Sequence, residues 1–424
     1  GVDATRLDRL LVDTTAGACR RQRELSVALE GRWLVAAMCV GQVANLLSHV
    51  VVPAVMAQHL MPLWGLSASE AGIMASAYSL GYMASVPVLM TLTDRIDARV
   101  VLLVGSIVMG AATVAFGLFA SGLLSASLLW GLAGIGCAGA YMPGLRAMTD
   151  RLGAGDHSRS ITLYSACFSL GVGLSFLASQ VIADGYGWRM AFVITGIAPI
   201  VMVGVCLLMK PAWPIRGEQR LIDFRPVLRN RRAMGYILGY GVHCFELYGF
   251  RTWLVAFWSY IIARSGSDAA LLDPITLSVI ITLLAVPATV LGNEGAIRFG
   301  RHRSIATVMW ESAVVAFGVV LLVSAPPVFL LVLLLAYAFT LPGDSGALTS
   351  GMAMSANASE RGATMALHSM VGFGMAALGG VAVGLAIDAA GGPESNAGWS
   401  AAFVVMGFSI ALGPAVLKWS RKQA

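Results

Sequence analysis

Apolar segments of about 20 residues recur along the whole chain, and shorter polar segments separate them. An α-helix of this length crosses a hydrocarbon core of about 30 Å, so each apolar segment is predicted to be a membrane-spanning helix. The twelve predicted spans are Trp33–Gln58, Ala71–Leu92, Val100–Ser121, Ser125–Leu145, Ile161–Ala183, Met190–Met209, Met234–Ile262, Ile275–Gly292, Ile305–Ser324, Pro327–Thr349, Thr364–Ala386 and Ser400–Trp419. This pattern predicts an all-α integral membrane protein.

Two longer polar segments suggest how the spans are grouped. Residues 1–32 are polar and rich in Arg, and they lack the apolar stretch of a signal peptide, so we expect a solvated tail. Residues 210–233 form the one long charged segment between spans, and this segment leaves six spans on either side. We therefore expect two six-helix bundles, 33–209 and 234–419, a cytoplasmic linker between them and a short tail at 420–424.

Composition supports a membrane protein. Of the 424 residues, 58% are hydrophobic and 12% are charged, whereas a soluble protein carries about 25% charged residues. This balance argues against a soluble enzyme or a disordered chain. The net charge of +6 is spread over many loops, and we find no basic stripe that would bind nucleic acid.

The basic residues predict the orientation of the spans. If the N-terminus is cytoplasmic and the twelve spans alternate, 25 of the 28 Lys and Arg residues fall on cytoplasmic segments. The exceptions are Arg189, Arg251 and Arg264. An excess of Lys and Arg marks cytoplasmic loops, and the preference for Arg over Lys favours a bacterial source. We therefore expect a multi-pass protein of the bacterial inner membrane with both termini in the cytoplasm.

The two halves of the chain resemble each other. The segment 187–193 (GWRMAFV), near the sixth span, is echoed by 398–404 (GWSAAFV) near the twelfth span. The segment 141–144 (YMPG) in the fourth span likewise resembles 340–343 (TLPG) in the tenth span. These correspondences indicate a tandem duplication, which is the arrangement found in many secondary transporters.

The loops after the second and eighth spans carry related charged motifs. Residues 90–99 read MTLTDRIDAR, and residues 293–303 read NEGAIRFGRHR. Together with the twelve spans and the repeat, these motifs resemble the loop signature of the major facilitator superfamily, and the resemblance covers essentially the whole chain. It implies two pseudo-symmetric six-helix bundles, the major facilitator fold, that work by alternating access.

The resemblance also implies roles for individual residues. Asp94, Arg95 and Arg99 match charged positions of the inner gate of that family. We assign Arg146 of the fourth span to the same gate. Two departures stand out: Trp130 replaces the usual Arg of the fourth span, and the fifth span lacks the Gly-Pro pair typical of drug/proton antiporters. The second departure argues against multidrug efflux.

The seventh span holds the densest set of ionisable residues within a predicted span. At about 100° per residue, Glu246 and Arg251 lie about 60° and 80° to either side of His243, so all three share one broad face. Ionisable groups are costly at this depth and usually functional. We predict that Arg251 binds an anionic substrate beside Tyr248, and that His243 and Glu246 carry protons. The alternative is a charge-balanced network that only fixes helix packing.

Gln42, Asn45 and His49 lie on one face of the first span, at spacing i, i+3 and i+7. We predict that they line a substrate cavity opposite the seventh span. For Gln42 and Asn45, hydrogen bonding between neighbouring helices is an equally good interpretation. For His49 the cavity is favoured.

The tenth span contains Asp344 directly after Pro342 and Gly343. A kinked helix would place this carboxylate at the cytoplasmic side of the cavity, so we predict a further proton-coupling residue. The alternative is an inner-gate salt bridge, for example with Arg146. The glycine-rich stretches 131–144 and 372–384 are predicted to allow close helix packing rather than to bind phosphate.

The sequence therefore predicts a secondary active transporter, a symporter that moves a small organic anion with protons. A proton-driven exporter of a metabolite or drug is the first alternative, and a transporter-like membrane sensor without turnover is the second. The sequence has no nucleotide-binding, metalloprotease or C-x-x-C motif, so we expect no enzyme, no cofactor and no metal. The expected partners of a monomeric protein are its substrate, protons and the lipid bilayer.

Overall fold

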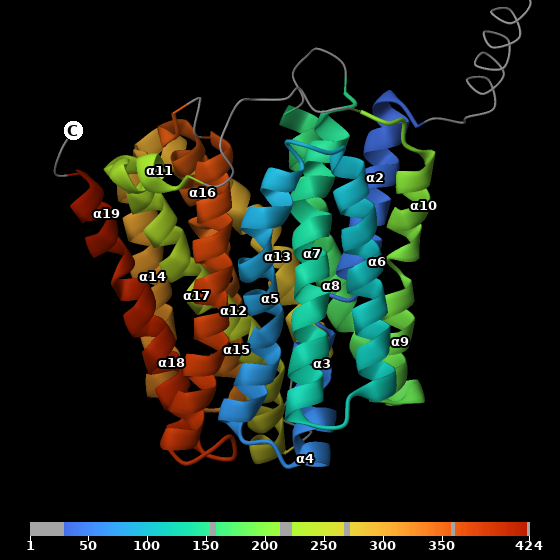
Figure 1. Cartoon of the computed structure of the whole chain (residues 1–424). Helices are drawn as coiled ribbons and strands as arrows, with labels where there is room; N and C mark the ends of the chain where they lie inside the picture. The colour runs from blue at the N-terminus through green and yellow to red at the C-terminus, as the bar shows by residue number, and fades with distance from the viewer. Residues whose placement is uncertain (1–28, 153–157, 213–222, 267–271, 358–360, 422–424) are drawn as a thin grey trace, which may run out of the picture.

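The computed structural model describes residues 29–152, 158–212, 223–266, 272–357 and 361–421. Within these residues every regular element is a helix, and no strand is present. The long helices run side by side in two groups (Figure 1). Most of the predicted N-terminal tail, the middle of the predicted linker and residues 422–424 lie outside the described residues.

The two groups of helices follow the order of the chain. The first bundle consists of α2 (Gly31–Leu46), α3 (Val51–Val55), the π-helix η1 (Met56–Leu60), α4 (Met61–Trp64), α5 (Ala68–Leu92), α6 (Ala98–Phe119), α7 (Leu123–Thr149), α8 (Ser158–Tyr186), α9 (Trp188–Ile197) and α10 (Ile200–Leu208). The second bundle consists of α12 (Arg231–Ser265), α13 (Pro274–Phe299), α14 (Arg301–Leu322), α15 (Pro327–Gly343), α16 (Ser345–Ser355), α17 (Arg361–Ala389), α18 (Asn396–Ala411) and α19 (Gly413–Arg421). The short helix α11 (Arg225–Arg229) precedes the second bundle.

The molecule has two opposite faces at the ends of its long helices. One face holds the start of α2, α11 and the end of α19, and we call it the linker face (Figure 1). The other face holds α4 and the C-terminal end of α17, and we call it the α4 face. The predicted orientation places the linker face in the cytoplasm.

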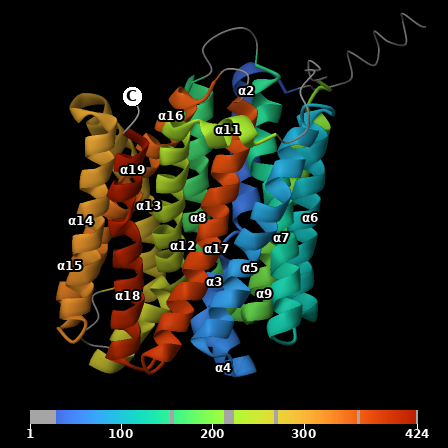
Figure 2. The ribbon, with the colours of Figure 1, turned by 60° about the vertical axis from the view of Figure 1, so that its left-hand side comes forward.

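The helices of the described residues fit the twelve predicted spans. Ten spans are long and apolar enough to cross a membrane, and the bent pair Gly31–Leu46 and Val51–Trp64 adds an eleventh. α12 has 35 residues and lies among the other spans (Figure 2). It is less apolar because it carries His243, Glu246 and Arg251, so composition alone does not mark it as a span.

Four of the predicted spans are divided into two or more helices in the structure. The breaks separate α2 from α3, α9 from α10, α15 from α16 and α18 from α19. A proline lies close to each break: Pro53, Pro199, Pro342 and Pro414. Proline has no N–H to bond the carbonyl four residues earlier, and its ring crowds that carbonyl. The first break bends the chain by 43°.

The two bundles meet most closely where α5 lies against α17 (Figures 1 and 2). A Cβ atom added at Gly72 would lie 2.7 Å from the carbonyl oxygen of Gly380, and one at Gly384 would lie 2.4 Å from that of Ala68. Only glycine permits this approach of one backbone to another. The glycine-rich stretch 372–384 therefore serves close helix packing, as the sequence predicts.

Hydrogen bonds also join α5 and α17 on the α4 face. The Asp388 carboxylate of α17 accepts the backbone N–H groups of Ala68 and Ser69 at 3.0 and 2.7 Å, and the Ser69 hydroxyl at 2.5 Å. Gln58 donates to the Ser259 hydroxyl nearby, at 3.5 Å. These hydrogen bonds join the two bundles on the α4 face.

Candidate functional site

The break between α2 and α3 exposes backbone groups that a neighbouring helix satisfies. The Ser175 hydroxyl of α8 accepts the Val50 N–H at 3.2 Å and donates to the Leu47 carbonyl at 2.7 Å. His49 lies at this break, with its Nδ1 atom 3.0 Å from the Tyr78 hydroxyl. Irregular backbone inside a membrane is tolerated where protein groups satisfy it or a cavity adjoins it. The break therefore places His49 at a defined position between the bundles.

Arg251 lies near the middle of α12 and faces the first bundle. Its guanidinium carbon is 5.2 Å from the centre of the Tyr248 ring, which is a cation–π contact. Among the described residues, no carboxylate lies within 4.0 Å of this guanidinium. Glu246 instead accepts the Tyr337 hydroxyl, and Asp344 pairs with His243. Arginine stays charged in proteins, so its charge has no ion-pair partner in this part of the chain.

Arg251 lines two cavities of about 30 Å³ each. One cavity lies between the bundles and is also lined by His49, Tyr248 and Trp130. The other lies between α8 of the first bundle and α12, α13 and α15 of the second. The structure thus brings together Arg251, Tyr248 and His49, which the sequence predicts as substrate-binding residues. Trp130, at the position where the family usually has Arg, joins them.

Glu246 is fully buried within the second bundle. Its Oε1 atom accepts the Tyr337 hydroxyl of α15 at 2.6 Å and the Ser312 hydroxyl of α14 at 2.8 Å. Its Oε2 atom has no hydrogen-bond partner among the described residues. The carboxylate is therefore held by two hydroxyl groups rather than by Arg251, although both residues lie on α12.

His243 and Asp344 form a buried pair. The Nδ1 atom of His243 lies 2.7 Å from an Asp344 oxygen, outside hydrogen-bond geometry, and both side chains are at most 2% exposed. Asp344 occupies the break between α15 and α16. The Tyr240 ring stacks on His368 at 3.9 Å and faces His243 at 5.7 Å. Asp344 thus pairs with His243 and not with Arg146, the alternative partner considered from the sequence.

Gln42 and Asn45 lie on the predicted face of α2 but bond to neighbouring helices. The Tyr164 hydroxyl of α8 donates to Gln42 at 2.8 Å, and Asn45 donates to the Ser106 hydroxyl of α6 at 3.1 Å. Both side chains are almost fully buried, and neither lines a cavity at Arg251. Their contacts match the interpretation as links between helices.

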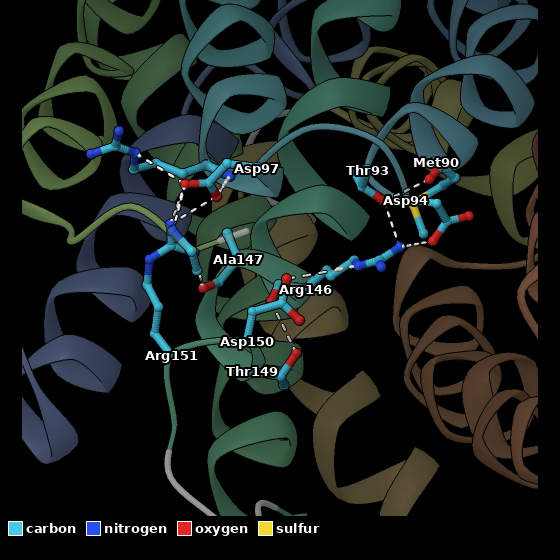
Figure 3. A network of polar contacts seen from close by, with 11 residues as sticks. Met90, Thr93, Asp94, Asp97, Arg146, Ala147, Thr149, Asp150 and Arg151 are labelled. Atoms are coloured by element: carbon cyan, nitrogen blue, oxygen red, sulfur yellow. Dashed lines mark hydrogen bonds and ion pairs between the residues drawn. The ribbon is translucent and has the colours of Figure 1, made fainter. Parts of the chain in front are cut away.

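The predicted gate residues lie at the linker face, between the end of α5 and the start of α6 and near the end of α7. Figure 3 shows Asp94 and Arg146 of this group. Arg146 of α7 donates to Asp94 at 2.5 Å and to the Thr93 hydroxyl at 2.8 Å, and it lies 3.8 Å from Asp150. The Asp94 side chain is 62% exposed, and Arg95 is exposed as well. All of these contacts lie within the first bundle.

Asp97, which the sequence does not predict as a site residue, is the buried centre of a second group (Figure 3). Its two oxygens each lie 2.7 Å from Nη2 of Arg151, and it accepts the Ala212 and Arg99 N–H groups at 2.9 Å each. The Arg99 side chain donates to the Met209 carbonyl at 2.6 Å. Burial raises the pKa of the Asp97 carboxyl, but the bonds from Arg151 and two backbone N–H groups outweigh burial and lower its pKa.

Two kinds of residue at this site are not predicted from the sequence. The motif places the acidic residue of the family at Asp94. Asp97 stands directly before an apolar helix, and this N-cap position is the sequence signal that could have identified it. Tyr337 and Ser312 carry no charge and no motif, so only the fold brings them to Glu246. No group of three metal-binding side chains occurs among the described residues.

Two helical bundles with cavities between them define a class of multi-pass membrane transporters. Within this class, the sequence shows the family. The family model described as Major Facilitator Superfamily matches residues 38–380, and the chain belongs to this superfamily. Proteins of this family are generally transporters rather than enzymes.

Two curated proteins match part of the chain. The membrane sensor protein UhpC of Salmonella typhimurium is 27% identical over 168 residues, which are 38% of this chain and 35% of that protein. The probable sulfoacetate transporter SauU of Cupriavidus necator is 30% identical over 132 residues, which are 31% of this chain and 30% of that protein. The matched part thus spans about a third of each relative.

Solved structures match the fold over almost the whole chain. A bacterial homologue of the human lysosomal transporter Spinster, in an inward-facing and occupied conformation, aligns with a TM-score of 0.73 and 16% identity. The match covers 92% of this chain and 97% of that one. A mutant form of the nucleoside transporter NupG aligns with a TM-score of 0.71 and 12% identity, over 92% of this chain and 100% of that one. At these identities the likeness establishes the fold alone.

Proposed function

We propose that this protein is a secondary active transporter that moves a small organic anion across the membrane together with protons. The observation that carries this proposal is Arg251. It lies between the two bundles, lines two cavities and has no carboxylate within 4.0 Å among the described residues. A guanidinium binds a carboxylate through two parallel hydrogen bonds, so an anionic substrate supplies the missing partner.

Buried ionisable residues of the second bundle support proton coupling. Glu246 and the pair formed by His243 and Asp344 lie in the second bundle, on α12 and at the break of the α15–α16 span. Carboxylates and histidines inside a protein gain or lose a proton when their surroundings change. We assign proton coupling to these three residues and substrate contact to Arg251, with Tyr248 and His49 beside it.

The orientation in the membrane follows from the charges. Lys and Arg residues gather at the helix ends of the linker face, which favours a cytoplasmic linker face and a bacterial inner-membrane location. We propose that Asp94, Arg95, Arg99 and Arg146 form a gate on this side. Reporter domains fused within residues 210–232 and near Gly391 test the orientation, and a cytoplasmic signal at Gly391 contradicts it.

Binding to purified protein tests the anion site. A panel of short carboxylates, each with its uncharged amide, is added to the full-length protein in detergent, and melting temperatures are recorded. Ligands that bind only the folded state raise the melting temperature. We expect carboxylates to stabilise the protein and amides to have no effect. Arg251→Lys should weaken the stabilisation and Arg251→Met should remove it.

The control for these variants is Arg298→Met, because the Arg298 side chain is 68% exposed and pairs with Glu294 of its own helix. Equal stabilisation of the Arg251→Met and Arg298→Met proteins by carboxylates would overturn the anion site. Counterflow of a labelled carboxylate in proteoliposomes then separates transport from sensing. The match to a membrane sensor protein gives that second function a specific basis, and binding without counterflow would favour it.

A further inference from the structure

The two cavities that meet at Arg251 differ in chemistry. The first presents hydrogen-bonding groups from α5, α12 and the break after α2: His49, Ser76, Tyr78, Ser79 and Thr252. The second is lined mainly by hydrocarbon from α8, α12, α13 and α15: Phe176, Leu247, Phe250, Leu254, Ile281 and Leu341. We call them the polar cavity and the apolar cavity.

The polar cavity contains a hydroxyl group without a partner. Ser76 is 4% exposed, and its Oγ atom makes no hydrogen bond to any described residue. A buried hydroxyl without a partner costs about 1–3 kcal/mol. A ligand group that exchanges a hydrogen bond with Ser76 relieves this cost. The polar cavity is therefore suited to a hydroxyl or carbonyl group.

Among the described residues that line the apolar cavity, no side chain besides Arg251 has a free polar group. Its Thr282 hydroxyl already donates to the Ser278 carbonyl at 2.7 Å, and its Tyr337 hydroxyl already donates to Glu246. Arg251 is the one cationic side chain that lines it. A second negative charge placed here would have no partner, and burying an unpaired charge is very costly. The cavity is therefore suited to hydrocarbon.

Arg251 lies where these two environments join, so a bound carboxylate has hydrogen-bonding groups on one side and hydrocarbon on the other. We propose that the substrate is a short monocarboxylate with an apolar side chain and a hydrogen-bonding group next to the carboxylate, such as a 2-hydroxy or 2-oxo acid. This inference rests on the proposed anion site at Arg251. Dianions of the same length are excluded by the lining of the apolar cavity.

A series of ligands on the wild-type protein tests the side chain. Dissociation constants are measured for acetate, propionate, butyrate and valerate, and for the dianions succinate and glutarate. Each methylene group buried in the apolar cavity should tighten binding roughly fourfold until the cavity is filled. Succinate and glutarate should bind at least tenfold more weakly than butyrate and valerate, their monoanionic counterparts of equal length.

Variants test which cavity binds each part of the ligand. We call its apolar side chain the apolar arm and its hydrogen-bonding group the polar arm. Ile281→Ala enlarges the apolar cavity and should shift the best chain length upward while acetate binding stays unchanged, and Ile281→Val is the milder version. Ile194→Ala is the control, since Ile194 is exposed on α9.

For the polar arm, 2-hydroxybutyrate should bind roughly fivefold more tightly than butyrate. Ser76→Ala should remove this gain, whereas Ser127→Ala, which also loses an unpartnered hydroxyl, should keep it.

The outcomes separate this inference from the proposed function. If no carboxylate binds, or if Arg251→Met binds carboxylates like the wild type, the anion site itself is wrong. If binding needs Arg251 but does not change with chain length, the apolar arm is wrong and the anion site stands. Equal affinity for the dianions also overturns the inference. A gain from the 2-hydroxyl that survives in Ser76→Ala overturns the polar arm.

Discussion

Asp97 joins three parts of the chain at the linker face. It caps the start of α6, pairs with Arg151 beyond the end of α7 and accepts the Ala212 N–H of the segment that follows α10. The side chains of Asp97 and Arg151 are only 9% and 6% exposed. Removing one member of a buried ion pair leaves the other charge without compensation, so Asp97 is a strong test of this region.

We expect Asp97→Asn to lower the free energy of unfolding by about 3 kcal/mol at pH 7. Because the pKa of Asp97 is lower in the folded protein than in the unfolded chain, the charged pair stabilises the protein above the ordinary pKa of about 3.9. This stabilisation is lost as the pH falls through the lower folded pKa. Melting temperatures from pH 7 to pH 3 should therefore converge for the two proteins.

The control for Asp97→Asn is Asp94→Asn. Asp94 also pairs with an Arg, but its side chain is mostly exposed, and an exposed pair contributes less than about 1 kcal/mol. A loss of stability as large in Asp94→Asn as in Asp97→Asn would contradict the assignment of the stabilising pair to Asp97 and Arg151.

Asp344 is the most direct test of proton coupling, because it touches His243 at a helix break beside the cavities. Asp344→Asn imitates the protonated carboxyl group, so the substrate half of the cycle should continue without proton movement. In proteoliposomes we expect counterflow to persist and accumulation driven by a pH gradient to be lost, with protein-free liposomes as background. Continued accumulation would move the coupling role to Glu246.

At the scale of elements, the break between α2 and α3 depends on another helix. Ser175 of α8 supplies both hydrogen bonds that satisfy Val50 and Leu47. Ser175→Ala leaves two buried backbone groups without partners, at about 1–3 kcal/mol each. We expect a lower melting temperature and, since His49 adjoins the break, weaker carboxylate binding.

Ser127→Ala is the matched control, since the Ser127 hydroxyl has no hydrogen-bond partner among the described residues. This variant should leave both the melting temperature and carboxylate binding near wild-type values. If Ser175→Ala behaves in the same way, the break does not depend on the bonds from α8.

The spans themselves could be predicted, because each must present an apolar surface to lipid and this requirement is local. The breaks within the spans could not be predicted from the sequence. Pro87, Pro143 and Pro287 lie inside continuous helices, whereas Pro53 and Pro342 lie close to breaks. A proline frees a carbonyl in every case, and the outcome depends on which neighbouring groups can satisfy the altered backbone. Those neighbours are set by the fold.

The candidate site was predictable to a similar extent. Helical spacing predicts His243, Glu246 and Arg251 on one broad face of the seventh span. In the structure all three lie on α12, but Arg251 faces the first bundle whereas Glu246 contacts α14 and α15. The partner of each residue was not predictable, because Asp344 and Tyr337 come from spans about 90 residues or more away in sequence. Spacing within one helix carries no information about the register of its neighbours.

At the scale of the molecule, the hydrogen bonds of Asp388 join the two bundles on the α4 face. We expect Asp388→Ala to favour conformations in which this face is open, because three bonds to a carboxylate join α5 to α17. Bonds to charged groups contribute about 1.5–3 kcal/mol, so the ratio of open to closed forms should rise roughly tenfold or more. Distances between spin labels on α5 and α17 report this ratio.

Asp273 provides the control on the same face. Its carboxylate also accepts two backbone N–H groups and one hydroxyl, from Ile275 and Thr276, but all of them belong to its own helix α13. Asp273→Ala should therefore lower stability without changing the distances between labels. Equal distance changes in both variants would show that loss of a helix cap, rather than loss of a link between bundles, opens the face.

The contact of α5 with α17 also bears on the rate at which a molecule can enter from the α4 side. At Gly72 and Gly384 the two helices contact each other through main-chain atoms, which no change of side-chain rotamer can move out of the path of a ligand. Entry there requires displacement of whole helices, a motion of microseconds to milliseconds. The observed association rate from this side should consequently reach a plateau as ligand concentration rises, because helix separation rather than diffusion becomes the slow step.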